Sequence, residues 1–408
     1  MEIDRDVLIV GGGLNGPALA LALASAGVSS LVLDAAPAAD LARADFDGRA
    51  YALALSSRRM LGALGLWGGL EPQAQAILEI KISDGKAGRG AAPWFLHFDA
   101  AEIDDGPMGH FLEDRWLRAA LMAAVAAEPR IELRNSARVV GQTVLPGGVE
   151  AAEADGKVWR GRLLVGCDGR ASQVAARAGI ARTGWDYAQT SLVCAVAHDL
   201  PHRGVAHQFF MPEGPLAILP LPGNRSSIVW TEARDRAAAI EALDDAGYLA
   251  ALRPRFGDFL GDIRLAGARY SYPLGLSLAE RFVDARLALA GDAAHGIHPL
   301  AGQGLNLGLR DVAALAEVVA TANRRGQDIG GADVLAEYQR WRRFDAAMLA
   351  AATDGLNRLF SNDNPLLRLG RDLGLGLVNR LPSLRRGLIR EAAGLSGALP
   401  RLLQGRPL

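Results

Sequence analysis

The feature that most constrains the fold is a glycine-rich turn near the N-terminus. The run Gly11-Gly12-Gly13-Leu14-Asn15-Gly16 follows a short apolar stretch at 7–10 and precedes an alanine- and leucine-rich stretch that ends at Gly27. A second apolar stretch, 31–33, ends at the acidic residue Asp34. A GxGxxG that links a strand to a helix, with an acid about 20 residues further on, is typical of a dinucleotide-binding βαβ unit.

Each glycine of this motif has a steric reason. Gly11 allows the tight turn, Gly13 lets the backbone approach a pyrophosphate, and Gly16 lets the helix pack closely on the sheet. The helix that follows offers N–H groups and partial positive charge to the phosphates, and Asp34 is suited to bind ribose hydroxyls. The motif alone does not distinguish NAD from FAD. The expected cofactor-binding residues of this segment are Gly11, Gly13, Leu14, Asn15, Gly16 and Asp34.

Composition excludes several classes of protein. Apolar residues make up 50% and charged residues 22% of the 408-residue chain, which excludes a disordered protein. The net charge of −1 provides no overall field that would attract the chain to nucleic acid. The two cysteines, Cys167 and Cys194, form no CxxC pair, which fits a reducing cytoplasm. The uncharged stretch 7–33 contains five glycines and Pro17, which favours a buried strand–helix–strand over a membrane span.

The pattern along the rest of the chain predicts an α/β (α+β) fold. Buried strands are expected at 162–166 and 286–290, and the block 186–283 alternates short strands with Pro/Gly turns around one helix at 235–252. This block predicts a second, sheet-rich domain. From 333 to the end the pattern is helical throughout. Further helices are predicted at 115–127, 172–178 and 304–322, and further strands at 131–133, 137–143 and 149–153.

Two more motifs favour FAD through a resemblance to a known family. Residues 163–172 read LLVGCDGRAS, and residues 287–308 read LALAGDAAHGIHPLAGQGLNLG. Together with the N-terminal GxGxxG, they resemble the fingerprints of the FAD-dependent aromatic hydroxylases of the para-hydroxybenzoate hydroxylase type. Within that class, WDYAQ at 185–189, FFMPEGPLAILPL at 209–221 and LAEYQRWRR at 335–343 look like the ubiquinone-biosynthesis hydroxylases.

The resemblance implies an FAD-binding Rossmann-like domain with an inserted, sheet-rich substrate domain and a helical C-terminus. The implied segments are 1–77, 101–185 and 284–345 for the FAD-binding domain, 78–100 and 186–283 for the substrate domain, and 346–408 for the C-terminal helical region. No second GxGxxG occurs in a βαβ context. Any NAD(P)H is therefore expected to bind briefly, as a transient co-substrate over the flavin.

Further cofactor contacts are expected at the late glycine-rich motif. Asp292 follows a strand, so it lies at the carboxyl end of the sheet, where its carboxylate can accept hydrogen bonds from the ribityl hydroxyls of FAD. The helix that begins near Gly302 would direct its N–H groups at the flavin pyrimidine edge, where reduction places negative charge. By resemblance, two arginines and an Asp-Gly pair also contact FAD. The full set in these segments is Arg49, Arg115, Asp168, Gly169, Gly291, Asp292, Pro299, Gly302, Gln303, Gly304, Leu305 and Asn306.

One position departs from the family pattern. After Asp-Gly the family continues with Ser, two residues and then Arg; here Ser172 is kept, Ala175 takes the Arg position, and Arg177 lies two residues further on. The histidines at 198, 202 and 207 and those at 295 and 298 have metal-like spacing, but no cysteine or carboxylate cluster accompanies them. We therefore predict no metal site.

The function implied by the resemblance is hydroxylation of the aromatic ring of a polyprenylated phenol in ubiquinone biosynthesis. FAD, NAD(P)H and O2 would take part through a flavin C4a-hydroperoxide. The sequence identifies no catalytic base. Two alternatives stay open: a flavin monooxygenase or epoxidase that acts on another apolar substrate, and a non-catalytic flavoprotein scaffold of a biosynthetic complex.

The C-terminal segment 366–408 has its own character. It contains eight arginines and two acids, hence a charge of +6, and its leucines recur on one helical face. Such a segment either contacts a membrane surface or a biosynthetic complex, or packs on the protein core. A polyprenylated substrate favours a cytoplasmic protein that associates peripherally with the membrane. The leucines concerned are Leu369, Leu373, Leu377, Leu381, Leu384 and Leu388.

Overall fold

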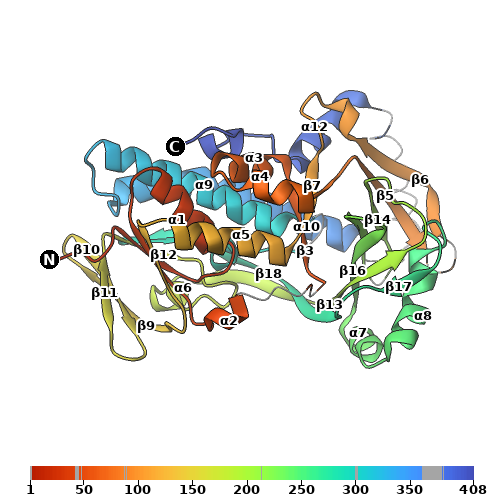
Figure 1. Ribbon diagram of the computed structural model, residues 1–408, viewed down its shortest axis with the longest axis horizontal. Helices are drawn as coiled ribbons and strands as arrows, with labels where there is room; N and C mark the ends of the chain where they lie inside the picture. Colours follow the sequence, from red (N-terminus) through yellow and green to blue (C-terminus); the bar gives the residue numbers. More distant parts are fainter. Residues whose placement is uncertain are drawn as a thin grey trace.

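The computed structural model describes residues 2–41, 46, 48–86, 88, 90–212, 214–298, 302–360, 379 and 381–408. In these ranges the chain forms two large sheets at opposite ends of an elongated molecule, with long helices between and above them (Figure 1). The first sheet holds the N-terminal strands, and the second contains most of the middle of the chain. No helix in these ranges is both long and apolar enough to cross a membrane.

The first sheet has β1 near its centre, which explains why this strand is apolar throughout. The strand order is β19-β20-β12-β1-β2-β8; all neighbours pair in parallel except β19 with β20. Because parallel strands align their carboxyl ends, the turns after β1, β12 and β20 meet at one edge of the sheet. The bounds are β1 Val7–Val10, β2 Ser30–Leu33, β8 Ile131–Arg134, β12 Leu163–Gly166, β19 Val283–Asp284 and β20 Leu287–Leu289.

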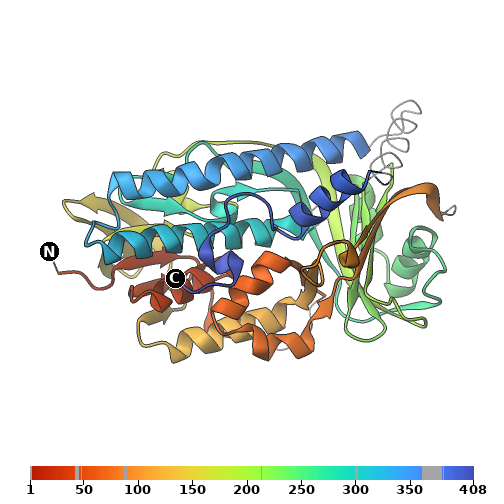
Figure 2. The same ribbon diagram turned by 90° about the horizontal axis from the view of Figure 1, so that it is seen from above.

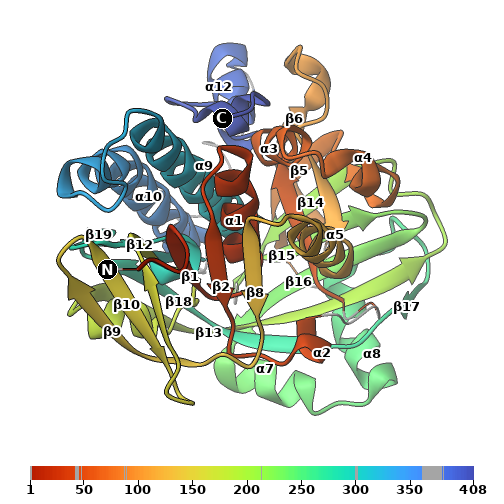
Figure 3. The ribbon, with the colours of Figure 1, turned by 60° about the vertical axis from the view of Figure 1, so that its left-hand side comes forward.

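Helices and a small sheet cover these strands. Helix α1 (Asn15–Ser25) connects β1 to β2 and packs on α5 (Asp114–Ala127) and α9 (Gln303–Arg324). The helices α9 and α10 (Ala332–Phe360) run side by side along the molecule (Figure 2), and α10 reaches the second sheet at β18. An antiparallel sheet of β9, β10 and β11 packs against β1 and β12 (Figure 3). Its bounds are β9 Val139–Leu145, β10 Gly148–Glu153 and β11 Val158–Gly161.

The second sheet has the order β21-β18-β13-β16-β15-β14-β5-β6, with β17 paired to β13. Trp230, Tyr248 and Phe256 are buried in its core, which α7 and α8 cover. The bounds are β5 Glu79–Lys86, β6 Gly90–Asp99, β13 Arg182–His198, β14 Val205–Phe210, β15 Leu216–Leu221, β16 Arg225–Ala233, β17 Ile263–Leu265, β18 Tyr270–Ala279 and β21 His295–Gly296, with helices α7 Arg234–Glu241 and α8 Asp245–Phe256. The division into domains expected from the sequence stays a prediction. The proposed boundary at 345, however, falls inside the continuous helix α10.

A third set of short elements joins the two sheets. Strand β7 pairs with both β3 and β4, and the helices α3 and α4 follow β3 along the chain. The bounds are α2 Ala38–Leu41, β3 Ala50–Ala54, α3 Leu55–Ala63, α4 Trp67–Leu70, η1 Glu71–Gln73, β4 Gln75–Ala76, η2 Ala100–Glu102, β7 Gly109–Glu113, α6 Gln173–Arg177 and η3 Gly291–Ala293.

Two predicted helices are wrong in extent. The single helix expected at 235–252 is two helices, because Asp244 accepts a hydrogen bond from the backbone N–H of Gly247 and caps α8 anew. The C-terminus is not helical throughout. After α12 (Pro382–Ala392), Gly394 and Gly397 adopt left-handed φ angles, and the chain resumes only as a 3-10 turn, η5, at Arg401–Gln404.

Candidate functional site

The glycine loop after β1 leaves space that the chain itself does not fill. Gly11 has φ of 111°, and a Cβ there would lie 2.3 Å from the carbonyl oxygen of Cys167. A Cβ at Gly16 would lie 2.0 Å from the carbonyl oxygen of Gly11. Gly13 differs, because a Cβ at that position would meet nothing within 4 Å. The chain's own packing therefore explains Gly11 and Gly16, whereas Gly13 borders open space that a ligand can enter.

The start of α1 suits an anion. Leu14, the residue before α1, provides no side-chain cap, so the first N–H groups of the helix depend on water or on a ligand. Asp34 braces the loop from the end of β2: its carboxylate accepts hydrogen bonds from the backbone N–H groups of Gly12 and of Ala36, the latter at 2.7 Å. Asp34 is half-buried, at the position expected for ribose recognition.

Asn15 joins the first glycine loop to the late one. A Cβ at Gly291 would lie 2.2 Å, and one at Gly308 2.6 Å, from the Asn15 side-chain nitrogen. Both glycines are therefore needed to make room for Asn15. Its side-chain oxygen is buried and has no hydrogen-bond partner in the part of the chain that the structure describes. Burial of such an atom costs free energy unless a ligand or water forms a hydrogen bond with it.

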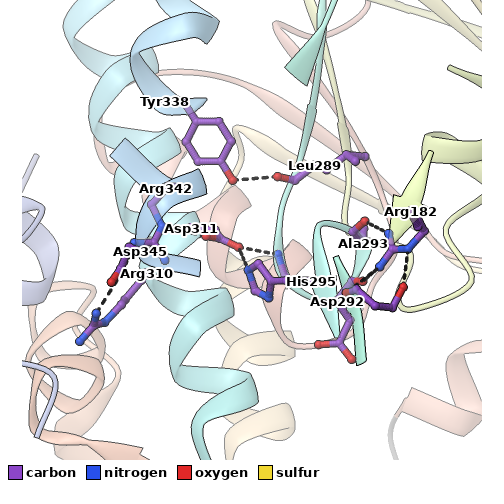
Figure 4. Close-up of polar contacts among 12 residues, drawn as sticks. Arg182, Leu289, Asp292, Ala293, His295, Arg310, Asp311, Tyr338, Arg342 and Asp345 are labelled. Carbon is purple, nitrogen blue, oxygen red and sulfur yellow. Dashed lines mark hydrogen bonds and ion pairs between the residues drawn. The ribbon is translucent and has the colours of Figure 1, made fainter. Parts of the chain in front are cut away.

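Asp292 lies at the carboxyl end of β20, as predicted, with 41% of its side chain exposed. Two arginines hold its loop. Arg170 approaches the Asp292 carboxylate at 3.3 Å and donates to the carbonyl of Ile297 at 3.0 Å, while Arg182 donates to the carbonyls of Asp292 and Ala293 (Figure 4). The loop is thus fixed through its backbone, and the Asp292 carboxylate remains partly exposed.

Behind this loop lies a buried carboxylate, Asp311 of α9, with no exposed surface. It accepts hydrogen bonds from the backbone N–H of Gly291 at 2.9 Å, from Nε2 of His295 at 2.5 Å and from Nε of Arg342 at 2.8 Å (Figure 4). Burial acts to raise the pKa of Asp311, but His295 and Arg342 outweigh it and hold the pKa below its usual value. Asp311 is therefore a charged anchor for the 291–295 turn.

The same anchor extends to α10. Tyr338 donates to the carbonyl of Leu289 at 2.7 Å, and Arg342 also pairs with Asp345, which in turn binds Arg310 at 3.2 Å (Figure 4). Both long helices thus form hydrogen bonds with β20 or with the turn that follows it. Sequence reasoning missed this network and the two loop arginines, Arg170 and Arg182. The available signal was the pair of charges in NLGLRD, on an otherwise apolar helix face.

At the start of α9, part of the backbone borders open space, and one side chain connects the helix to β3. Gly302 has φ of 63°, provides no side-chain cap and lies beside Ala52, whereas a Cβ at Gly304 would meet nothing within 4 Å. Gln303 and Leu305 are half-buried here. The Asn306 side chain is engaged within the chain, since it accepts from the backbone N–H of Ala54 at 2.8 Å and donates to the carbonyl of Ala52 at 2.7 Å. Pro299 lies outside the described residues.

The Asp168 carboxylate caps α6. It accepts from the Ser172 hydroxyl at 2.5 Å and from the backbone N–H groups of Gln173 and Val174. Gly169, with φ of 81°, borders open space. Arg177 does not substitute for the missing family arginine, because its guanidinium donates to Gln142 and the carbonyl of Val139 on β9.

Arg49 and Arg115 lie at one corner, because β3 and β7 pair with Ala50 opposite Glu113. Arg49 is 3.6 Å from the Asp114 carboxylate, and Nε of Arg115 donates to Glu113 at 2.8 Å. Strand β3 also contacts the start of α9, so this corner adjoins the late glycine motif. No group of three or more potential metal ligands occurs in the described ranges.

These residues fit FAD. Two helix N-termini without side-chain caps adjoin glycines that border open space, and the buried amide oxygen of Asn15 has no partner among the described residues. A carboxylate and several arginines line the same edge of the sheet. This donor and acceptor set suits a diphosphate, ribose or ribityl hydroxyls and a planar ring that must approach backbone closely.

Comparison with known proteins agrees with this assignment. A family model described as an FAD binding domain matches residues 4–353. The chain is 48% identical to the ubiquinone hydroxylase UbiL of Rhodospirillum rubrum over 99% of its own length and 93% of that protein. It is 34% identical to the 3-demethoxyubiquinol 3-hydroxylase of Escherichia coli, over 96% and 98% of the two chains. Among solved structures, p-nitrophenol 4-monooxygenase PnpA from Pseudomonas putida superposes with a TM-score of 0.78 at 22% identity, covering 97% and 99%, and so shows the shared fold.

Proposed function

The chain belongs to the FAD-binding-domain family of flavin-dependent monooxygenases, and we propose that it hydroxylates the aromatic ring of a polyprenylated phenol in ubiquinone biosynthesis. The observation that supports the substrate class is the near-half identity to a ubiquinone hydroxylase along almost the whole chain. NAD(P)H and O2 are the proposed co-substrates. The intact glycine loops favour an enzyme over a non-catalytic scaffold.

FAD, when bound, accepts a hydride from NAD(P)H and activates O2 for transfer of one oxygen atom to the ring. In the proposed site, Gly13 and the N-terminus of α1 bind the diphosphate, while Gly11 and Gly16 allow the tight turn and the close helix packing that bring them there. Asp34 binds ribose hydroxyls. Arg49 and Arg115 contact the cofactor from the β3–β7 corner.

The late motif receives the flavin itself. Asp292 would accept hydrogen bonds from the ribityl hydroxyls, and the backbone of Gly302, Gln303, Gly304 and Leu305 would hold the ring edge. The N-terminus of α9 there stabilises the negative charge of the reduced ring. Asn306 contributes indirectly, since its side chain fixes β3 against this helix start. The Asp168–Gly169 turn shapes the wall beside Asp292.

The second sheet provides a cover for the substrate. In this proposal the sheet also shields the ring from water, which matters because activated oxygen otherwise decays to hydrogen peroxide. A polyprenyl chain requires an apolar path. We further propose that α12 contacts the lipid phase: Leu381, Leu384 and Leu388 are exposed there next to arginines. The predicted leucines Leu369, Leu373 and Leu377 lie outside the described residues.

A deletion strain tests the proposal. We expect loss of ubiquinone and accumulation of a polyprenylated precursor that lacks one ring hydroxyl, with recovery on expression of the wild-type chain. Expression of Asp292→Ala should not restore ubiquinone. Unchanged ubiquinone in the deletion strain, or full recovery by a variant shown to lack FAD, would favour another apolar substrate or a scaffold.

A further inference from the structure

One buried side chain in the segment 291–298, which follows β20, has polar atoms that the described part of the chain does not use. His298 lies between β21 and the start of α9 and is 1% exposed. Neither Nδ1 nor Nε2 has a hydrogen-bond partner in the described part of the chain. His295, three residues earlier in the same loop, instead directs Nε2 to Asp311. Two unpaired nitrogens on one buried ring are unfavourable, unless a bound molecule pairs with them.

The described neighbours of His298 contact its ring but form no hydrogen bond with its nitrogens. Its only ring contact in the described residues is with Tyr187, edge to face, with centroids 5.3 Å apart. Tyr187 projects from an irregular part of β13, next to Ala188 with φ of 54°, and its hydroxyl donates to Asp354 of α10 at 2.9 Å. Trp185 donates to the same carboxylate at 3.1 Å. The Tyr187 hydroxyl is thus committed to α10, and the imidazole nitrogens remain for a ligand.

His298 is a neutral imidazole at physiological pH. Burial, and secondarily the positive charge of Arg170, lower its pKa to about 4, while Asp354 opposes the shift. A neutral imidazole offers one N–H donor and one lone-pair acceptor. The lone pair is matched by a donor such as a hydroxyl, whereas the N–H on the other side of the ring needs a separate acceptor.

We propose that His298 hydrogen-bonds the phenolic hydroxyl of the substrate and thereby orients the aromatic ring beside the flavin. The proposal rests on the proposed function. A phenol has a pKa near 10, so the hydroxyl keeps its proton and donates a hydrogen bond to the neutral imidazole. This bond increases electron density on the ring, which favours attack on activated oxygen.

The position of His298 supports a substrate contact. It lies four residues before Gly302, the residue that precedes α9. It also touches a residue of the second sheet, through Tyr187 of β13. A side chain at the junction of the two sheets, with both nitrogens unpaired, is suited to a molecule that lies between them.

The test measures how strongly the holoenzyme prefers a phenol over its methyl ether. The probes are 2-geranylphenol and 2-geranylanisole, titrated anaerobically into the oxidised protein while flavin fluorescence is followed. Three variants are compared: His298→Phe, which keeps a ring but no nitrogen, His298→Asn, which restores polar atoms, and His110→Phe. His110 is a matched control, because it packs against the ring of Trp67, its Nδ1 has no partner among the described residues, and it lies on β7 instead of in the segment 291–298.

The wild type should bind the phenol about tenfold more tightly than the ether, as expected for one buried hydrogen bond. His298→Phe should bind both equally, His298→Asn should recover part of the preference, and His110→Phe should keep all of it. Equal discrimination in wild type and His298→Phe would overturn the proposal. A shifted flavin spectrum or lowered FAD content in His298→Phe would also overturn it, by placing the ring on the flavin. Failure of the wild type to bind either probe would instead reject the proposed substrate class, and this proposal with it.

Discussion

The backbone N–H of Gly291 donates a 2.9 Å hydrogen bond to the carboxylate of Asp311, twenty residues further along the chain. This contact joins the turn after β20 to a fully buried charge in α9. Because Asp292 is the next residue, the position of its carboxylate depends on a group that it never touches. The buried Asp311 thereby determines where the proposed ribityl contact lies.

Replacement of this anchor should weaken FAD binding and the fold together. In Asp311→Ala, Arg342 loses its buried partner, and we expect a loss of about 3–5 kcal/mol in the free energy of unfolding. Urea denaturation and the FAD dissociation constant are the measurements. Asp345→Asn is the control. It also removes a negatively charged partner of Arg342 but leaves the Gly291 contact, so FAD affinity should stay near wild type. Equal FAD affinity in all three proteins would show that Asp311 does not position the loop.

Gly13 provides a test that separates folding from cofactor binding. A Cβ at Gly13 meets no atom of the chain within 4 Å, so Gly13→Ala should fold with near wild-type stability. The same methyl group would occupy the space proposed for the diphosphate, and FAD content should fall at least tenfold. The ratio of flavin to protein absorbance, with circular dichroism, measures both. Gly68→Ala, where a Cβ also meets nothing within 4 Å, should change neither; a fully flavinated Gly13→Ala would argue against the diphosphate position.

Loss of the Asp292 carboxylate should release FAD without unfolding the protein. The side chain is partly exposed and its carboxylate contacts Arg170 at 3.3 Å, so Asp292→Ala should cost little stability. Purified protein should be largely colourless. Asp284→Ala, on β19 of the same sheet, removes a comparable exposed pair with Arg281 and should remain yellow. A yellow Asp292→Ala protein would contradict the role given to this residue.

The free energy of unfolding should decrease as pH is lowered, and part of this decrease should come from His298. Its folded-state pKa is about 4, against about 6.5 when unfolded, so between these values the unfolded chain binds a proton that the native state does not. The stabilisation is complete above pH 6.5 and declines as pH falls toward 4, by about 2 kcal/mol at pH 5. Urea unfolding at pH 7 and pH 5 should show a smaller decline in His298→Phe than in wild type. Identical declines would indicate that His298 titrates normally.

Membrane contact is testable on α12. Leu384 and Leu388 are exposed, and the double change to Glu should reduce sedimentation with anionic vesicles several-fold while leaving FAD content unchanged. Leu200→Glu, at an equally exposed leucine between β13 and β14, should bind vesicles as wild type does. Binding that is unaffected by the double change would place the lipid contact elsewhere.

The parts that sequence reasoning predicted are local. The strand, turn and helix around Gly11–Gly16 follow from a short apolar run and glycine sterics, and Asp292 follows from its place after a strand. The Asp311 network could not be predicted, because its bonds to Gly291 and Arg342 span 20 and 31 residues. Asn306 shows the same limit: its motif predicts cofactor contact, whereas its side chain ties α9 to β3, some 250 residues earlier.

The most direct test of the central claim is the fate of molecular oxygen. Purified flavinated protein is mixed with NAD(P)H, 2-geranylphenol and 18O2, and the products are analysed by mass spectrometry. The account predicts a catechol or hydroquinone product that contains one 18O atom, formed in proportion to the NAD(P)H consumed. Oxidation of NAD(P)H with all of the 18O recovered as hydrogen peroxide, and an unchanged phenol, would contradict it.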